Sequence, residues 1–158
     1  MESFDWQIAG LPLHPLFVHG AVVIIPLAAL MIMLTAVWPA AARKLTFLTP
    51  AVAGVGLVLA FGAHVSGEWL FDRVGRSAAL AEHIAYAELM NPAAGLLALA
   101  AGALWWWQRR LSSGPPVRPR AARIGTVATS AFGILVAVGA LVAVVLTGDA
   151  GARAVWLG

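Results

Sequence analysis

The stretch FVHGAVVIIPLAALMIMLTAVW, residues 17–38, decides the fold class because it is long and almost wholly apolar. A helix of this length spans about 33 Å, which matches a hydrocarbon core roughly 30 Å thick. Further apolar blocks follow at about residues 45–70, 77–108 and 123–147. The four blocks predict four membrane-spanning helices.

The composition of the chain points to the same class. Of its 158 residues, 61% are hydrophobic and 11% are charged, whereas soluble domains are about half apolar and a quarter charged. A water-soluble globule is therefore excluded. Because short loops make consecutive helices antiparallel, we expect one all-α domain over residues 1–158, an integral membrane four-helix bundle with up-down-up-down topology. The chain has no cysteine, which excludes disulfides, iron–sulfur clusters and haem attached through Cys.

The basic residues predict how the bundle is oriented in the membrane. Seven of the ten cations fall in two loops: Arg43, Lys44, Arg109, Arg110, Arg118, Arg120 and Arg123. The positive-inside rule places both loops in the cytoplasm, so both termini are expected outside. The tryptophans at 105–107 mark the cytoplasmic boundary. We expect the lipid bilayer to be the main partner of the chain. We interpret the basic loops as topology signals and expect them to be a binding site neither for lipid nor for nucleic acid.

Three histidines from three predicted helices reach one depth. His19 and His64 each lie about 29 Å from the cytoplasmic end of their helices, and His83 lies about 36 Å away before tilt. This level is the outer boundary of the bilayer. His14 belongs to the same side of the chain, and Asp149 follows the last helix at a similar height.

Ionisable groups at the edge of a bundle interior indicate function, and imidazole suits haem iron, Zn and Cu. The predicted cofactor or metal ligands are therefore His19, His64 and His83. Asp149, Glu68 and His14 are ranked behind them. In the alternative interpretation, each histidine ring lies in the headgroup region, partly exposed to water, and binds no ligand.

The segment LPLHPLFVHGA, residues 11–21, resembles the opening of a bacterial family of small four-helix membrane proteins called domain of unknown function 2231. Further matches are the run SGEW at residues 66–69, and His83 with Asn91. The chain departs from the family at residues 148–152, where GDAGA stands in place of Gly-His-x-Gly-Gly, and His64 is additional.

The resemblance covers the whole chain and implies a multi-pass protein of the bacterial inner membrane. The positions that it carries over are His19 and His83. Members of the family are sometimes fused to Rieske-type or cytochrome c-type domains, which implies membrane electron transfer by association.

Three functions remain open at this point. We expect the chain to be an electron carrier or a subunit of a complex rather than an enzyme that acts alone. In the first, histidines hold haem b and electrons pass between a quinol and an extracytoplasmic redox protein. Small residues of the second helix would make room for the porphyrin, and Arg73 or Arg76 would meet its propionates. In the second, the same residues bind a Zn, Cu or Fe ion. In the third, the chain is an accessory subunit of a homo-oligomer or larger complex, docked through Gly- and Ala-rich faces.

Overall fold

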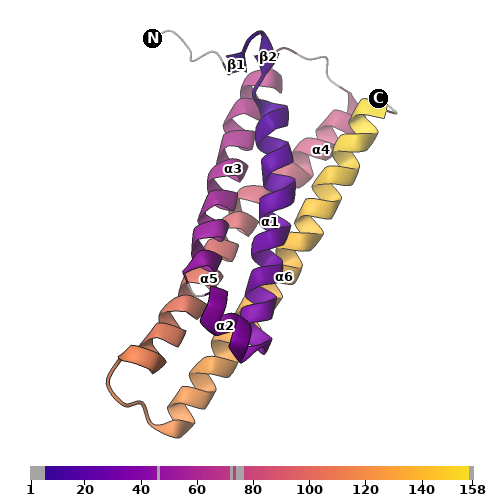
Figure 1. The fold of residues 1–158 in the computed structure, drawn as a ribbon. Coiled ribbons are helices and arrows are strands. Elements are labelled where there is room, and N and C mark those ends of the chain that lie inside the picture. The colour runs from indigo at the N-terminus through magenta and orange to yellow at the C-terminus, as the bar shows by residue number, and fades with distance from the viewer. Residues whose placement is uncertain (1–5, 46, 72, 74–76, 157–158) are drawn as a thin grey trace.

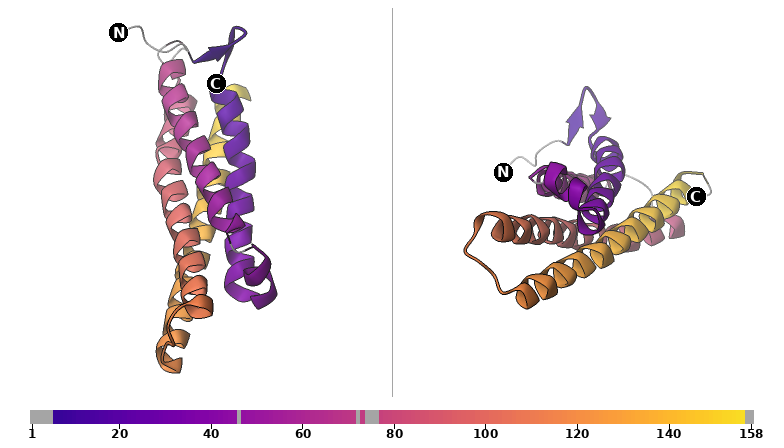
Figure 2. Two further views of the ribbon diagram at one scale, coloured as in Figure 1. Left: turned by 60° about the vertical axis from the view of Figure 1, so that its left-hand side comes forward. Right: turned by 60° about the horizontal axis from the view of Figure 1, so that its bottom comes forward.

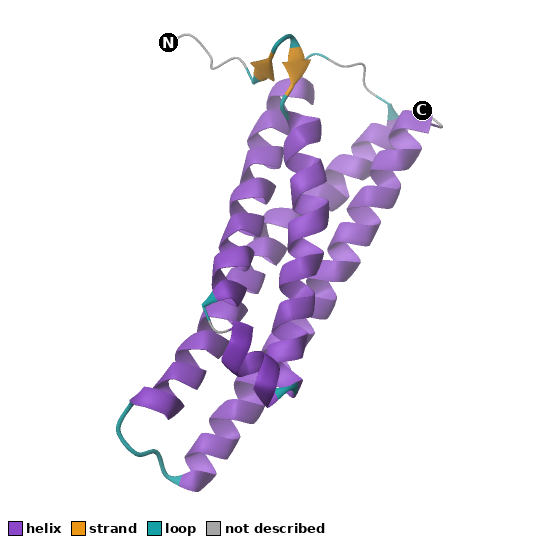
Figure 3. Cartoon of the chain, in the orientation of Figure 1, coloured by secondary structure: helices purple, strands orange, loops and turns teal. Residues whose placement is uncertain are grey.

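The chain folds into a bundle of long helices. The computed structural model describes residues 6–45, 47–71, 73 and 77–156. Two short strands come first, β1 (Gln7–Ile8) and β2 (Leu11–Pro12). The helices are α1 (His14–Val37), α2 (Pro39–Leu45), α3 (Leu48–Phe71), α4 (Ala78–Ala87), α5 (Met90–Ser113) and α6 (Pro119–Trp156). Helices dominate the fold (Figure 3), which confirms the all-α prediction.

Four stretches of the described chain are long and apolar enough to cross a membrane, with α4 and α5 together forming one of them. Figure 1 shows the long helices side by side and alternating in direction. The first and last described residues, 6 and 156, lie at one end of the bundle, which also carries His14 and His83 and is called the histidine end below. The opposite end carries α2 and the α5–α6 connection and is called the arginine end. The α5–α6 connection extends beyond α2 there (Figures 1 and 2).

Several helix boundaries differ from the predicted ones. The third apolar block is two helices, because the chain turns at Glu88 and Leu89 before α5 begins. Pro92 has no N–H to donate to the carbonyl of Glu88, so one helical hydrogen bond is missing across this turn. The last helix continues well past residue 147, supported by an ion pair between Asp149 and Arg153 one turn apart.

Two short elements were not predicted from the sequence. The helix α2 follows Trp38 directly, where Pro39 was expected only to end the first helix. The strands β1 and β2 pair antiparallel around Ala9 and Gly10, whose φ angles of 51° and 78° are both positive. A two-residue turn of this hand matches the twist of the flanking strands.

The core is built from close contacts between helices with small residues. Helix α1 packs mainly on α3 and α6. A Cβ atom added at Gly62 of α3 would lie 2.6 Å from the Phe17 ring, and one added at Gly56 would lie 3.2 Å from the Ile25 side chain. The expectation that the small residues of this helix leave room for a porphyrin is therefore wrong at these positions. Side chains of α1 occupy the space.

The outer surface of the bundle is apolar. Large aliphatic side chains such as Val23, Leu99 and Leu135 are each more than 60% exposed. A soluble protein rarely exposes so extensive an apolar surface, so these faces are suited to lipid. The side of the membrane on which each end lies stays a prediction.

The closest helix contact at the arginine end tests the packing. The Trp107 ring lies against the backbone of Gly125, where a Cβ atom would overlap the ring. We expect Gly125→Ala to displace the ring and to lower the free energy of unfolding by about 1–3 kcal/mol. Thermal unfolding in detergent measures the change. Gly139→Ala on the same helix is the control, because nothing lies within 4 Å of its added Cβ. Equal stability of the two variants would contradict this packing.

Orientation is tested by labelling single cysteines in a chain that has none of its own. Ser112→Cys lies at the arginine end and Ala152→Cys at the histidine end, and both positions are exposed. In intact cells a membrane-impermeant maleimide should label position 152 and spare position 112, because the basic loops are expected inside. The reverse pattern would overturn the predicted orientation.

Candidate functional site

His14 is turned into the bundle at the first residue of α1. Its Nδ1 atom lies 2.9 Å from the main-chain oxygen of Ala63 in α3. The ring packs on Gly67, where an added Cβ would lie 3.0 Å from the ring atom Cε1. Ala63 and Gly67 are one helical turn apart, so the missing side chain at Gly67 leaves the Ala63 carbonyl accessible to a second donor.

His83 repeats this arrangement on the other side of the bundle. It lies on α4, and its Nδ1 atom is 3.1 Å from the main-chain oxygen of Thr147 in α6. Its ring packs on Gly151, where an added Cβ would lie 3.1 Å from the ring. Thr147 and Gly151 are again one turn apart. The same combination of a glycine and an accessible carbonyl therefore holds both histidines.

The hydrogen bonds define the chemistry that the two rings can offer. When Nδ1 carries the proton and donates to a carbonyl, Nε2 keeps its lone pair and can accept a proton or bind a metal. The histidine end thus carries two half-buried imidazoles on separate helices, and the main-chain carbonyl that each ring binds holds it in one tautomer.

The other two histidines face away from this pair. His19 is exposed, and its Nδ1 atom is 2.6 Å from the oxygen of Pro15 on its own helix. It follows His14 by five residues, or roughly 140° around the helix. His64 has a side chain 40% exposed and lies 3.5 Å from Glu68. The expected convergence of His19, His64 and His83 is therefore wrong, because equal depth does not fix the direction of a side chain.

The carboxylates at this end are held by other partners. Arg153 lies 2.8 Å from Asp149 and 3.3 Å from Glu82, and all three side chains are about half exposed. This cluster joins α4 to α6 beside His83. Within the described residues, no three His, Asp or Glu side chains are grouped so that they could hold a metal ion.

One side-chain oxygen on α5 and one on α6 are buried without a hydrogen-bond partner. They are Oδ1 of Asn91, near the start of α5, and Oγ1 of Thr147, whose main-chain carbonyl binds His83. Buried polar atoms in proteins are nearly always hydrogen-bonded to protein or to water. A bound water or ligand at these atoms would satisfy them.

The loop after α3 differs from the propionate site expected there. The guanidinium of Arg73 lies 3.7 Å from the centre of the Trp69 ring and donates to the Trp69 carbonyl. Arg73 is therefore held by Trp69. Asp72 and Arg76, the other charges expected in this loop, lie outside the described residues.

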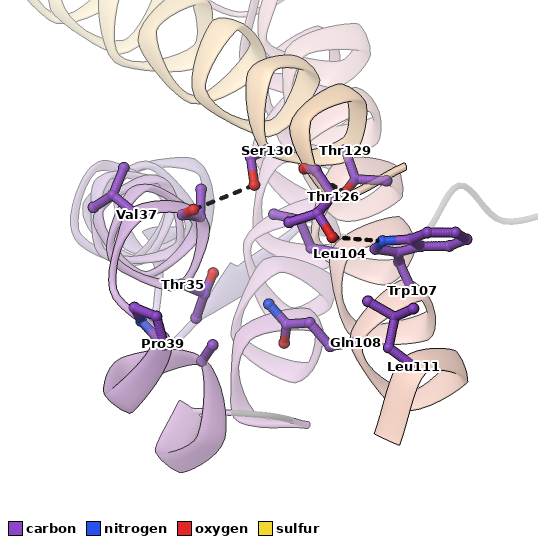
Figure 4. Close-up of a pocket in the computed structure, with 12 residues that line it drawn as sticks. Thr35, Val37, Pro39, Leu104, Trp107, Gln108, Leu111, Thr126, Thr129 and Ser130 are labelled. Atoms are coloured by element: carbon purple, nitrogen blue, oxygen red, sulfur yellow. Dashed lines mark hydrogen bonds between the residues drawn. The ribbon is translucent and has the colours of Figure 1, made fainter. Parts of the chain in front are cut away.

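A cavity of about 200 Å³ lies at the arginine end, between α1, α2, α5 and α6 (Figure 4). In its wall Ser130 donates to the carbonyl of Ala36, and Trp107 donates to Thr126. All the residues that line it are uncharged. This cavity was not predicted from the sequence, because the residues that line it come from four helices.

Comparison with known proteins adds no relative: no family model, curated protein or solved structure matches the chain. The resemblance to domain of unknown function 2231 therefore stays a prediction.

Proposed function

We propose that this chain is a membrane electron-transfer protein that holds haem b between His14 and His83. One observation carries the proposal: two interior histidines on separate helices each bind a main-chain carbonyl through Nδ1. Histidines that ligate metals commonly donate their second ring N–H in this way, which orients the ring and raises the basicity of the ligating nitrogen. His83 is one of the ligands expected from the sequence, and His14 takes the place expected for His19 or His64.

The number of available donors favours haem over a bare ion. Zinc sites use three or four protein ligands, and the described residues offer no such group. Haem iron takes its axial ligands from one or two side chains, because the porphyrin nitrogens fill the other positions. Two histidines on facing helices meet this requirement, and helix bundles commonly hold cofactors in this way.

Space for the porphyrin must come from the side of α4. This helix packs almost wholly on α6 and makes few contacts with α1 or α3. A porphyrin between the two rings requires α4 to stand away from α1. The glycines do not supply the space, because the rings of His14 and His83 already lie on them.

The protein would contribute orientation and environment, while bound haem supplies one-electron chemistry. The Ala63 and Thr147 carbonyls hold the two rings in one tautomer. All seven acidic residues of the chain lie in the sequence next to the histidine end, so a redox protein that docks there is expected to be basic. In this proposal a quinol reaches the site from the bilayer.

The test is an absorption spectrum of the full chain, purified from cells supplied with haem. We expect a Soret band with wild type and its loss in His14→Ala and His83→Ala, because each removes one axial ligand. His19→Ala and His64→Ala are the matched controls and should keep the band. A wild-type protein that stays colourless after haem is added would sink the proposal, as would a band that depends on His19 and is independent of His14.

The supporting glycines provide a separate test of the ligand geometry. Gly67→Ala and Gly151→Ala each place a Cβ about 3 Å from a histidine ring, so the ring must shift and its bond to the carbonyl must lengthen. We expect either variant to bind haem about 10- to 100-fold more weakly, because loss of a hydrogen bond to a ligating histidine has an effect of this size. The midpoint potential should change as well, because the same hydrogen bond sets the basicity of the ligating nitrogen. Redox titration measures this. Gly148→Ala, with open space around it, should match wild type.

A further inference from the structure

The charges of the chain are divided between its two ends. The sequence has no Asp or Glu from residue 6 to 67 or from 89 to 148. The arginine end therefore carries seven cations and no acid: Arg43, Lys44, Arg109, Arg110, Arg118, Arg120 and Arg123. Nothing within the chain can neutralise these charges locally, so their counterions must come from outside.

The depth of the arginines can be measured from the contact between Trp107 and Gly125, which fixes the register of α5 against α6. Arg110 follows Trp107 by three residues, about 5 Å further from the membrane centre, and Arg120 precedes Gly125 by five, about 8 Å further. The polar layer on each side of the hydrocarbon core is roughly 5–8 Å thick. Tryptophan rings sit at the headgroup level of the bilayer, so arginines that begin one turn beyond Trp107 lie within reach of the lipid phosphates.

Four of these side chains are free to meet a ligand. Arg109, Arg118, Arg120 and Arg123 are exposed, and Arg109 stays near the boundary with its guanidinium 5.8 Å from the centre of the Trp105 ring. Arg110 has a different role, since its guanidinium donates to the Pro115 carbonyl at 2.6 Å and closes the α5–α6 connection. The connection thus holds four guanidinium groups around one helix hairpin.

We propose that the arginine end is a binding site for anionic phospholipids, in which Arg109, Arg118, Arg120 and Arg123 hold the phosphate groups. A guanidinium binds two phosphate oxygens at once, and clusters of basic residues next to a membrane helix attract anionic lipids. Zwitterionic lipids carry the same phosphate with a compensating ammonium, so net negative charge decides the preference. The site does not depend on the proposed haem, because it lies at the opposite end of the bundle.

The test is native mass spectrometry of the full chain in detergent with equal amounts of phosphatidylglycerol and phosphatidylcholine. Wild type should retain phosphatidylglycerol in severalfold excess, and raised salt should reduce the excess. The variant with Arg109→Gln, Arg118→Gln, Arg120→Gln and Arg123→Gln should lose most of it. Arg43, Lys44 and Arg110 stay in place to direct membrane insertion. Arg73→Gln with Arg153→Gln removes charge at the histidine end and should keep the excess.

Each remaining outcome decides the proposal. Equal retention of the two lipids by wild type, or an unchanged preference in the four-arginine variant, would overturn it. Displacement of the lipid by inorganic phosphate at equal concentration would show a site for free phosphate in place of lipid. If the four-arginine variant fails to insert, the single variants Arg118→Gln and Arg120→Gln, measured in the same way, should each lower the lipid ratio, and no change in either would also overturn the proposal.

Discussion

Close approach of helix backbones is the constraint on which this bundle depends. Lipid tails are as apolar as the side chains that face them, so burial of apolar surface does little to hold membrane helices together. Contact must come from packing, and Gly56, Gly62 and Gly125 allow side chains of α1 and α5 to lie against a neighbouring backbone. The many buried alanines serve the same purpose. The packing of the helices therefore depends on positions where a residue has a small side chain or none.

The histidine pair follows from this constraint. A glycine that allows close approach also uncovers the carbonyl one turn before it, and an imidazole N–H can then reach that carbonyl from the next helix. This happens at Gly67 with His14 and at Gly151 with His83. The contacts that pack the helices thus also set the tautomer of each ring. The same hydrogen bonds therefore join neighbouring helices and orient the histidine rings.

The sequence predicted the fold class well and the directions of the histidine side chains poorly, for physical reasons. Long apolar blocks predict spans because the thickness of the bilayer fixes their length, and four spans are present. The choice among histidines needed the direction of each ring, which depends on helix rotation and on a partner far along the chain. His14 was ranked low because it precedes the apolar run, yet it begins α1. Asp149 looked like a ligand in the place of a histidine, but a local ion pair with Arg153 accounts for it.

The break between α4 and α5 makes α4 a short helix that is less firmly packed than the rest of the bundle. None of the residues of α4 is fully buried, and the helix is capped at its start by the Ser77 hydroxyl. A segment with so little buried surface opens locally at a lower free energy than the core, and its amides exchange with solvent earlier. His83 thus lies on the helix with the least buried surface, while His14 lies on one of the best packed helices. The two histidines therefore differ in how firmly their helices are packed, and binding of the proposed haem would be coupled to the ordering of α4.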